Sequence, residues 1–227
     1  MSDDKDTEEL EEGTLLSHLI ELRSRLIKMF AAVIGVFILL LPFANRIFEV
    51  VAKPLVAVLP GQKMIATSVT APLLTPFKLT FFVAILIAIP VVLYQLWAFV
   101  APGLYRKEKR FAFPLLFSSI FLFYAGAAFA YFVVFPLVFG FFVKITPTDV
   151  EMTTDISQYL DFVTMIVLAF GLAFETPIAT VLTVWTGLTT PEKLGKARPY
   201  VFLLAFVIGM LLTPPDVISQ TLLAVPV

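Results

Sequence analysis

The sequence predicts an all-α integral membrane protein whose six helices form a single transmembrane domain. Of its 227 residues, 59% are hydrophobic, whereas soluble domains contain about 45–50%. Apolar runs long enough to cross a bilayer recur along the chain, separated by short polar segments. Basic residues concentrate in alternate polar segments: the N-terminal segment, residues 101–110 and residues 187–198 hold 11, against 5 in the others. Because basic segments stay on the cytoplasmic side, this alternation predicts a cytoplasmic N-terminus.

Composition also excludes several classes of function. A formal net charge of −1 provides no basic surface for nucleic acid. With no Cys and one His, we expect no disulfide, no iron–sulfur cluster and no metal site built from thiolates or several imidazoles. The sequence shows no nucleophile–base pair and no phosphate-binding loop, so we expect neither an enzyme nor a cofactor.

The chain opens with an acidic segment before the first span. Residues 1–13 carry seven acids against one Lys, which predicts a disordered, solvated tail. Thr14 is a candidate helix N-cap, so we expect the transmembrane domain over residues 14–227. Leucines then repeat at helical spacing, and Glu21 precedes Arg25 by one turn, an order that favours an ion pair. This amphipathic start is expected to continue directly into the first span.

Prolines and charges divide the middle of the chain. Residues 43–76 contain four prolines and scattered charge, which predicts an external cap of short helices. Residues 111–143 lack any charge, and one helix of that length would measure about 50 Å against a hydrocarbon core of about 30 Å. We therefore expect Pro136 to end the third span, and Pro90 to interrupt the second. The predicted spans are residues 20–41, 77–100, 113–135, 159–185, 200–212 and 217–227.

The last two predicted spans are short. Residues 200–212 provide about 20 Å of helix. The apolar run 217–227 stops before it could cross a bilayer, so the sixth helix is expected to be incomplete in this sequence. Short spans imply upright packing, local thinning of the bilayer, or both.

Glu175 lies near the middle of the fourth predicted span, just before Pro177. An acid at the centre of a membrane helix costs about 2.5–3.5 kcal/mol on insertion scales, so it should face protein or water. It could be a proton site, a polar contact for a partner helix, or a protonated or hydrogen-bonded structural carboxyl. Gln95 and Gln220 also lie in apolar runs, where we expect helix–helix hydrogen bonds.

Glu21 and Glu108 both lie on the predicted cytoplasmic side among basic residues. Spacing alone favours local pairing: Glu21 with Arg25, and Glu108 within its own basic loop. The alternative is a shared anionic site for a cationic peptide, since carboxylates match guanidinium groups in bidentate geometry. Phe99 is interpreted on its own as an aromatic anchor at the membrane interface.

Five segments together resemble the TatC family, the large polytopic subunits of the twin-arginine protein translocase. The resemblance covers nearly the whole chain from Leu15. It implies a concave six-helix bundle with short fifth and sixth helices, and a receptor for folded proteins that carry a twin-arginine signal peptide. The segments are SHLIELRSRL (17–26), FKLTFFVAILIAIPVVLYQLWAFVAPGLYRKEKR (77–110), FAYFVVFPLVFGFF (129–142), AFGLAFETPIA (169–179) and RPYVFLLAFVIGMLLTPPDVISQTLLAVP (198–226).

In this family the cytoplasmic N-terminal segment and the first cytoplasmic loop bind the two arginines of the signal peptide. The resemblance therefore implies that Glu21 and Glu108 are counter-charges for the two guanidinium groups. The whole implied signal-peptide site consists of Glu21, Arg23, Phe99, Pro102, Glu108 and Arg110.

The resemblance also implies contacts with other subunits. Glu175 and Gln220 are expected to contact the single transmembrane helices of TatA and TatB. Met210, Thr213 and Asp216 are expected on the side where TatB docks. Pro54 is expected in an external cap where copies of the family meet. The implied location is the bacterial cytoplasmic (inner) membrane, surrounded by lipid, with export driven by the proton-motive force. The positions implied for TatA and TatB are Glu175, Gln220, Met210, Thr213 and Asp216.

The residues alone leave two other functions open. A proton-coupled small-molecule transporter would use Glu175 as its protonation site, but the chain has one intramembrane acid, no internal repeat and no pair of discontinuous helices. A structural scaffold would bind no peptide at all.

Overall fold

The computed structural model describes residues 3–58, 64–100, 112–147, 153–212 and 221. Within these residues every regular element is a helix, and β structure is limited to one isolated bridge between Ile65 and Asp155. Four helical stretches are long and apolar enough to cross a membrane: Leu19–Ala57, Ala71–Phe99, Phe113–Ile145 and Ile156–Ala173. The prediction of an all-α integral membrane protein is confirmed.

Helix α1 runs from Asp3 to Leu40 over 38 residues. The helix therefore begins before the N-cap expected at Thr14. The disordered tail expected over residues 1–13 stays a prediction. Two physical effects favour the longer helix. Glu and Leu are strong helix formers, and acids near a helix N-terminus interact favourably with the helix dipole.

The predicted cap contains helix α2, Ala44–Val58, which follows a 3₁₀ turn at Leu41–Phe43. Helix α3 then spans Ala71–Val100 and begins six residues earlier than the predicted start at residue 77. The short cap helix is confirmed. The interruption expected at Pro90 is wrong, because α3 continues through this proline.

Tyrosine hydroxyls explain why two prolines leave their helices intact. A proline cannot donate to the carbonyl four residues before it, and that carbonyl needs another partner. In α3, the Leu86 carbonyl that precedes Pro90 accepts from the Tyr124 hydroxyl at 2.9 Å. In α2, the Val50 carbonyl that precedes Pro54 accepts from the Tyr131 hydroxyl at 2.7 Å.

The third predicted span does not end at Pro136. Helix α4, Ala112–Phe129, passes through a π-helical segment, Ala130–Val134, into helix α5, Phe135–Ile145. Proline fits here because it stands in the first turn of α5, directly after the widened π turn, where a missing N–H is tolerated. The expected end at residue 135 is therefore wrong, and the uncharged run stays helical.

The fourth predicted span is two helices, α6 (Ile156–Ala173) and α7 (Thr176–Trp185). Pro177 explains the break, because its ring takes the place of the N–H that would bond to the carbonyl of Ala173, the last residue of α6. A single span over residues 159–185 is thus wrong, and Glu175 lies at the break.

Helix α8, Pro191–Leu212, begins nine residues before the start predicted at residue 200. It contains most of the segment that had been assigned to a polar loop, and it passes through Pro199. The predicted sixth span, residues 217–227, lies outside the described residues except for residue 221.

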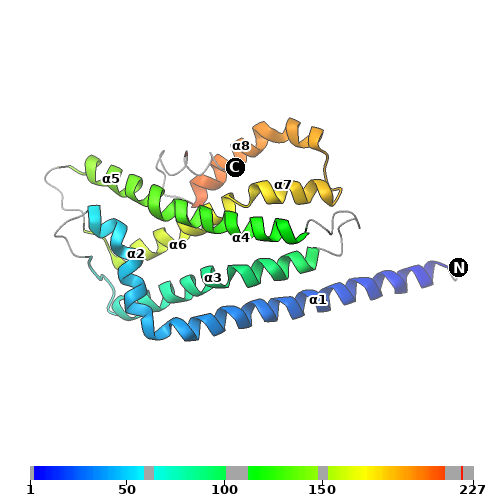
Figure 1. Ribbon diagram of the computed structural model, residues 1–227, viewed down its shortest axis with the longest axis horizontal. Coiled ribbons are helices and arrows are strands. Elements are labelled where there is room, and N and C mark those ends of the chain that lie inside the picture. The colour runs from blue at the N-terminus through cyan, green and yellow to red at the C-terminus, as the bar shows by residue number, and fades with distance from the viewer. Residues whose placement is uncertain (1–2, 59–63, 101–111, 148–152, 213–220, 222–227) are drawn as a thin grey trace.

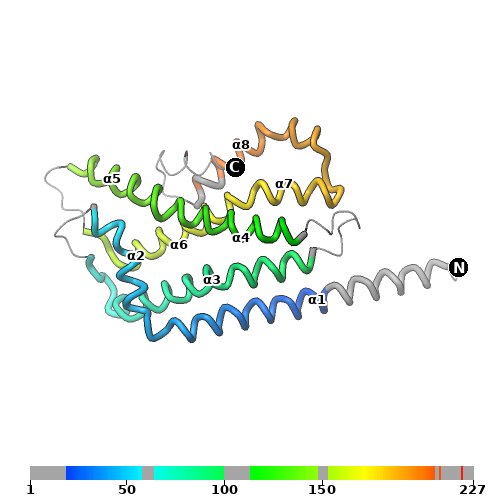
Figure 2. The backbone as a smooth tube through the Cα atoms, viewed as in Figure 1, coloured from blue at the N-terminus to red at the C-terminus, as the bar shows by residue number. Residues whose placement is uncertain are grey.

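The long helices lie side by side along the molecule (Figure 1). The end of α3, the start of α4 and the connection from α7 to α8 share one end, which we call the α7–α8 end. Helix α2, the start of α3, the end of α5 and the start of α6 share the opposite end, which we call the cap end. The tube in Figure 2 shows the same arrangement, in which α1 and α3 run in opposite directions.

The largest core lies where α2, α5 and α6 meet, and it contains the fully buried side chains of Leu55, Phe135, Ile166 and Phe170. Helices α4 and α6 approach closely at Gly126, where a Cβ atom would collide with the Phe170 carbonyl. Small residues allow such close approach between membrane helices. By contrast, α1 leaves large apolar side chains such as Phe30 exposed, as expected for a helix that faces lipid.

Candidate functional site

At the α7–α8 end, one hydrogen-bonded network joins α1 to α3. The Arg25 guanidinium donates to Glu21 Oε1 from Nε at 3.0 Å and from Nη2 at 2.5 Å. Its Nη1 donates to Gln95 Oε1 on α3 at 3.4 Å. The predicted Glu21–Arg25 pair and the predicted helix–helix hydrogen bond of Gln95 are both confirmed.

The network shows what the Glu21 carboxylate can do chemically. It already binds a guanidinium through two N–H groups, and 36% of the Glu21 side chain remains exposed, against 20% for Arg25. Charge-assisted hydrogen bonds of this type are about twice as strong as neutral ones. A partly exposed carboxylate in this setting is suited to recognising arginine.

Two other predicted residues lie near this network. Phe99 is half-buried and follows Gln95 by one turn of α3, beyond the buried side chain of Trp97. Arg23 is exposed and lines a shallow apolar groove of about 620 Å³ along α1, formed by residues that include Leu26 and Phe30. Pro102, Glu108 and Arg110 lie outside the described residues.

A second polar site lies inside the bundle, at the break between α6 and α7. Ser119 on α4, only 1% exposed, donates to Glu175 Oε2 at 2.6 Å. The other carboxyl oxygen, Oε1, is buried and has no hydrogen-bond partner in the described part of the chain. A buried polar atom without a partner is costly, so Oε1 is positioned to bond to a group outside the described residues.

Sequence reasoning missed Ser119. The available signal was the Ser118–Ser119 pair within a run of 33 uncharged residues, since a buried hydroxyl in a membrane helix needs a partner. Spacing could not show which serine faces Glu175, 56 residues away.

The other residues predicted for subunit contacts are only partly described. Met210 lies on α8 and is 64% exposed. Gln220, Thr213 and Asp216 lie outside the described residues. Pro54 is half-buried within α2. Because Pro54 has no N–H for the Val50 carbonyl, that carbonyl accepts a hydrogen bond from the Tyr131 hydroxyl instead.

Asp155 forms a polar junction at the cap end that the sequence had not indicated. Its Oδ1 caps α6 by accepting from the backbone N–H groups of Ser157 and Gln158 at 2.8 and 3.2 Å. Its Oδ2 accepts from the backbone and hydroxyl of Thr67 at 2.9 and 2.7 Å. These hydrogen bonds, with the Thr67 backbone first, lower the pKa of Asp155 from 3.8 to about 2. The junction fastens residues 65–67 to the start of α6.

The described residues thus define a multi-pass helical membrane protein with a guanidinium-binding carboxylate at one end and a half-satisfied carboxyl in its interior. The family described as Sec-independent protein translocase protein (TatC) matches residues 17–226. The chain belongs to the TatC family, whose members are components of a protein translocase.

Close relatives and solved structures agree with this assignment. The chain is 56% identical over 217 residues to the Sec-independent protein translocase protein TatC of Haemophilus influenzae, covering 95% of this chain and 85% of the relative. It is 57% identical over 213 residues to that of Escherichia coli (strain K12), covering 93% and 83%. A crystal structure described as the twin-arginine translocase receptor TatC superposes with a TM-score of 0.80 at 42% identity, covering 92% of each chain. A second, in DDM, has a TM-score of 0.82 at 41% identity and covers 92% and 93%.

Proposed function

We propose that this chain is the subunit of the twin-arginine translocase that binds the signal peptides of folded cargo proteins. Its solved relatives are described as twin-arginine translocase receptors. The observation that carries the proposal is the Glu21 carboxylate on α1, which binds the Arg25 guanidinium and is tied through it to Gln95 near the end of α3. Family membership favours this function over the small-molecule transporter.

The geometry of α1 and α3 supports a joint site for Glu21 and Phe99. The two helices run in opposite directions and meet where Arg25 contacts Gln95. Glu21 lies one turn beyond this contact on α1, and Phe99 lies one turn beyond it on α3, both toward the α7–α8 end. Residues four apart share a helix face, so the carboxylate and the aromatic ring belong to the same surface.

Binding then requires an exchange of guanidinium groups. An arginine of the signal peptide would share or replace Arg25 at Glu21, while Phe99 provides an apolar edge. The second arginine would pair with Glu108 of the following loop, with Arg23, Pro102 and Arg110 shaping the same surface. A lysine carries the same charge but not the planar fork of donors. Recognition through these carboxylates therefore favours arginine over lysine.

The interior carboxyl supports a second part of the proposal, contact with the single-span subunits TatA and TatB. Glu175 Oε1 is buried and lacks a partner among the described residues, so a polar side chain from a partner helix would satisfy it. Met210, exposed on α8, would belong to the docking side together with Gln220, Thr213 and Asp216. Copies of the chain would meet through the cap around Pro54.

Basic residues suggest how the protein lies in the membrane. Arg23, Arg25 and Lys28 on α1 lie at the same end as Lys193 and Lys196 on α8. By the positive-inside rule this end faces the cytoplasm. The protein would therefore lie in the bacterial cytoplasmic membrane with its peptide-binding surface inside, and export would draw on the proton-motive force.

Site-specific cross-linking tests the receptor proposal. A photoreactive residue is placed at Ser24, an exposed residue one turn from Glu21 that leaves its carboxylate in place, or at Phe99. Controls carry it at Glu192 at the same end or at Glu49 at the cap end. Each variant, in membranes, is exposed to a signal peptide with two arginines and to the same peptide with two lysines. We expect cross-links at 24 and 99 with the arginine peptide only. Equal cross-linking at all four positions, or with both peptides, would refute the proposal.

A further inference from the structure

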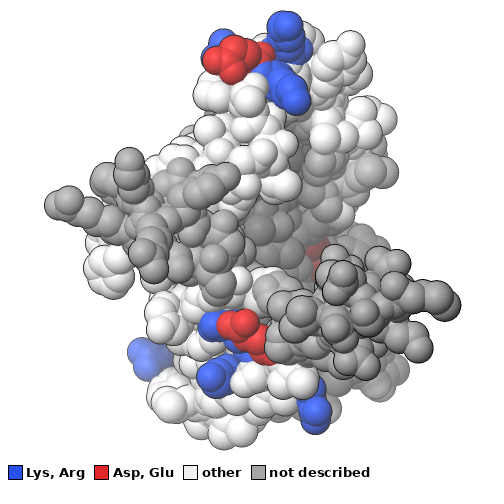
Figure 3. Space-filling view, turned by 90° about the vertical axis from the view of Figure 1, so that its right-hand side faces the viewer, with Lys and Arg blue, Asp and Glu red and all other residues white. Residues whose placement is uncertain are grey.

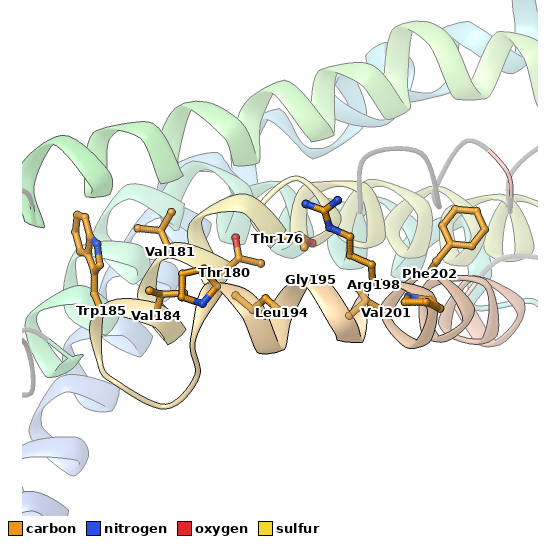
Figure 4. A pocket seen from close by; sticks show the side chains of 12 residues that line it. Thr176, Thr180, Val181, Val184, Trp185, Leu194, Gly195, Arg198, Val201 and Phe202 are labelled. Atoms are coloured by element: carbon orange, nitrogen blue, oxygen red, sulfur yellow. The ribbon is translucent and has the colours of Figure 1, made fainter.

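A cavity of about 860 Å³ lies between α7 and α8, away from the Glu21 network (Figure 4). Its lining runs along the whole of α7 from Thr176 to Trp185, a length of about 14 Å. Phe202 and Trp185 lie at opposite ends of the labelled wall. Cavities that hold small organic ligands have volumes of about 300–1,000 Å³, so this one is large enough for an occupant.

The wall of the cavity is chiefly apolar. Val181 and Val184 on α7 face Leu194 and Val201 on α8. Of the two hydroxyls in the lining, that of Thr180 already donates to the carbonyl of Pro177 at 2.7 Å. Such a wall offers few hydrogen-bond donors, which suits a hydrocarbon chain better than a polar solute.

One cation interrupts this apolar wall. The Arg198 side chain lines the cavity, and no hydrogen bond or ion pair links it to another described residue. Lys193 and Lys196 lie on the same helix, with Glu192 as the nearby acid. Figure 3, which faces the α7–α8 end, shows basic side chains gathered where α8 lies, apart from a second group where α1 lies. Arg198 is exposed, so its guanidinium lies at the open edge of the apolar cavity, where it can bind an anion; phosphate matches its fork of donors.

We infer that this cavity binds one phospholipid with an anionic headgroup. Its phosphate pairs with Arg198, and an acyl chain lies along the apolar wall between α7 and α8. The chain spans a membrane, so this ligand surrounds it at high concentration. Basic pockets between membrane helices are established lipid headgroup sites. A bound lipid would support α8, which follows α7 after the short connection from Thr186 to Thr190.

Native mass spectrometry of the detergent-purified full chain tests the inference. The probes are phosphatidylglycerol, phosphatidylcholine with the same acyl chains, and inorganic phosphate. Arg198→Gln removes the headgroup contact, with Lys196→Gln as the matched loss of one charge outside the lining. Gly195→Leu places a side chain at the cavity wall, and its Cβ would meet no atom within 4 Å. Gly35→Leu on α1 is the matched control in equally open space.

We expect one phosphatidylglycerol molecule to bind the unaltered protein more tightly than phosphatidylcholine, because the choline cation of phosphatidylcholine offsets its phosphate charge and would lie beside Arg198; inorganic phosphate should not compete. Arg198→Gln should weaken binding about tenfold or more, the scale of losing a charge-assisted hydrogen bond. Gly195→Leu should also weaken binding, because its side chain takes space from the acyl chain, while both controls bind normally. Equal losses in Arg198→Gln and Lys196→Gln, or equal binding of both lipids, would overturn the inference. So would an Arg198→Gln variant that keeps its lipid but no longer co-purifies with single-span subunits, because the occupant would then be a protein helix.

Discussion

Glu175 is bonded through one of its two carboxyl oxygens. Ser119 donates to Oε2, while Oε1 stays buried without a described partner. The carboxyl group is therefore fixed in direction by α4, with its second oxygen left buried and unbonded among the described residues. If a partner helix bonds to this oxygen as proposed, Ser119 acts as a positioning residue through Glu175.

Ser119→Ala tests this positioning. The change removes the hydrogen bond to Oε2 and should lower the free energy of unfolding by about 1–2 kcal/mol. It should also reduce co-purification of the single-span subunits. Thermal unfolding in detergent and pull-down from membranes provide the two measurements. Ser118→Ala is the matched control, because it removes a neighbouring hydroxyl that is not bonded to Glu175.

A Glu175→Ala background supplies a further check on the same contact. If Ser119 acts through Glu175, its substitution should add little once the carboxyl is absent. Fully additive losses of subunit recovery would show that Ser119 acts independently.

The lowered pKa of Asp155 predicts that the junction at the cap end weakens in acid. Its pKa is lowered to about 2 by the hydrogen bonds from Thr67 and the start of α6, against about 3.9 for an unfolded chain. A lowered folded-state pKa means that the stabilisation is complete above about pH 4 and is lost as the pH falls toward 2. Unfolding midpoints measured over this range should therefore decrease, and Asp155→Asn should remove this part of the dependence.

Asp161→Asn is the control for the acid range, since Asp161 is an exposed acid on the same helix. If the two variants lose the pH dependence equally, the Asp155 junction is not its source.

At the scale of helices, some prolines end a helix and others stand inside one, depending on whether a distant side chain bonds to the carbonyl that the proline leaves free. Pro177 ends α6, whereas Pro54 and Pro90 stand inside continuous helices. The Val50 and Leu86 carbonyls that these two prolines leave free are bonded by Tyr131 and Tyr124. Membrane helices tolerate proline where neighbouring side chains satisfy the freed backbone group.

Tyr131→Phe tests this compensation in α2. Loss of the hydroxyl leaves the Val50 carbonyl without a partner and should lower the free energy of unfolding by about 1–2 kcal/mol. Pro54→Ala in the same protein should recover much of the loss, because alanine restores the N–H that bonds to Val50 within the helix. A double-mutant cycle by chemical denaturation measures the recovery. Simple additivity would show that the two residues do not act on the same carbonyl.

These contacts show which parts of the fold the sequence could predict. Apolar runs and charge alternation predicted the membrane helices, because both depend on local composition. The continuation of α3 through Pro90 could not be predicted, since it depends on the Tyr124 hydroxyl, which lies 38 residues from the Leu86 carbonyl that it bonds. The start of α1 could not be located from composition, because an acidic segment is typical of disordered tails and also favours a helix N-terminus.

At the scale of the whole molecule, the antiparallel packing of α1 on α3 brings the two halves of the candidate receptor surface together. Sequence spacing predicted the Glu21–Arg25 pair, and the helix–helix hydrogen bond predicted for Gln95 is also present. The meeting of α1 and α3 at these residues is a tertiary contact across 70 positions and could not be predicted from spacing. Ser119 was missed for the same reason.

The central claim is that Glu21, together with Glu108, binds the arginines of a signal peptide. The most direct test measures the affinity of an arginine–arginine peptide and its lysine–lysine counterpart for the unaltered protein and for Glu21→Gln, Glu108→Gln and Glu192→Gln. We expect the first two variants to weaken binding of the arginine peptide about tenfold or more, with much smaller effects on the lysine peptide, because only guanidinium bonds to each carboxylate through two donors. Glu192→Gln should bind normally. Equal losses for both peptides, or no loss in Glu21→Gln, would contradict the claim.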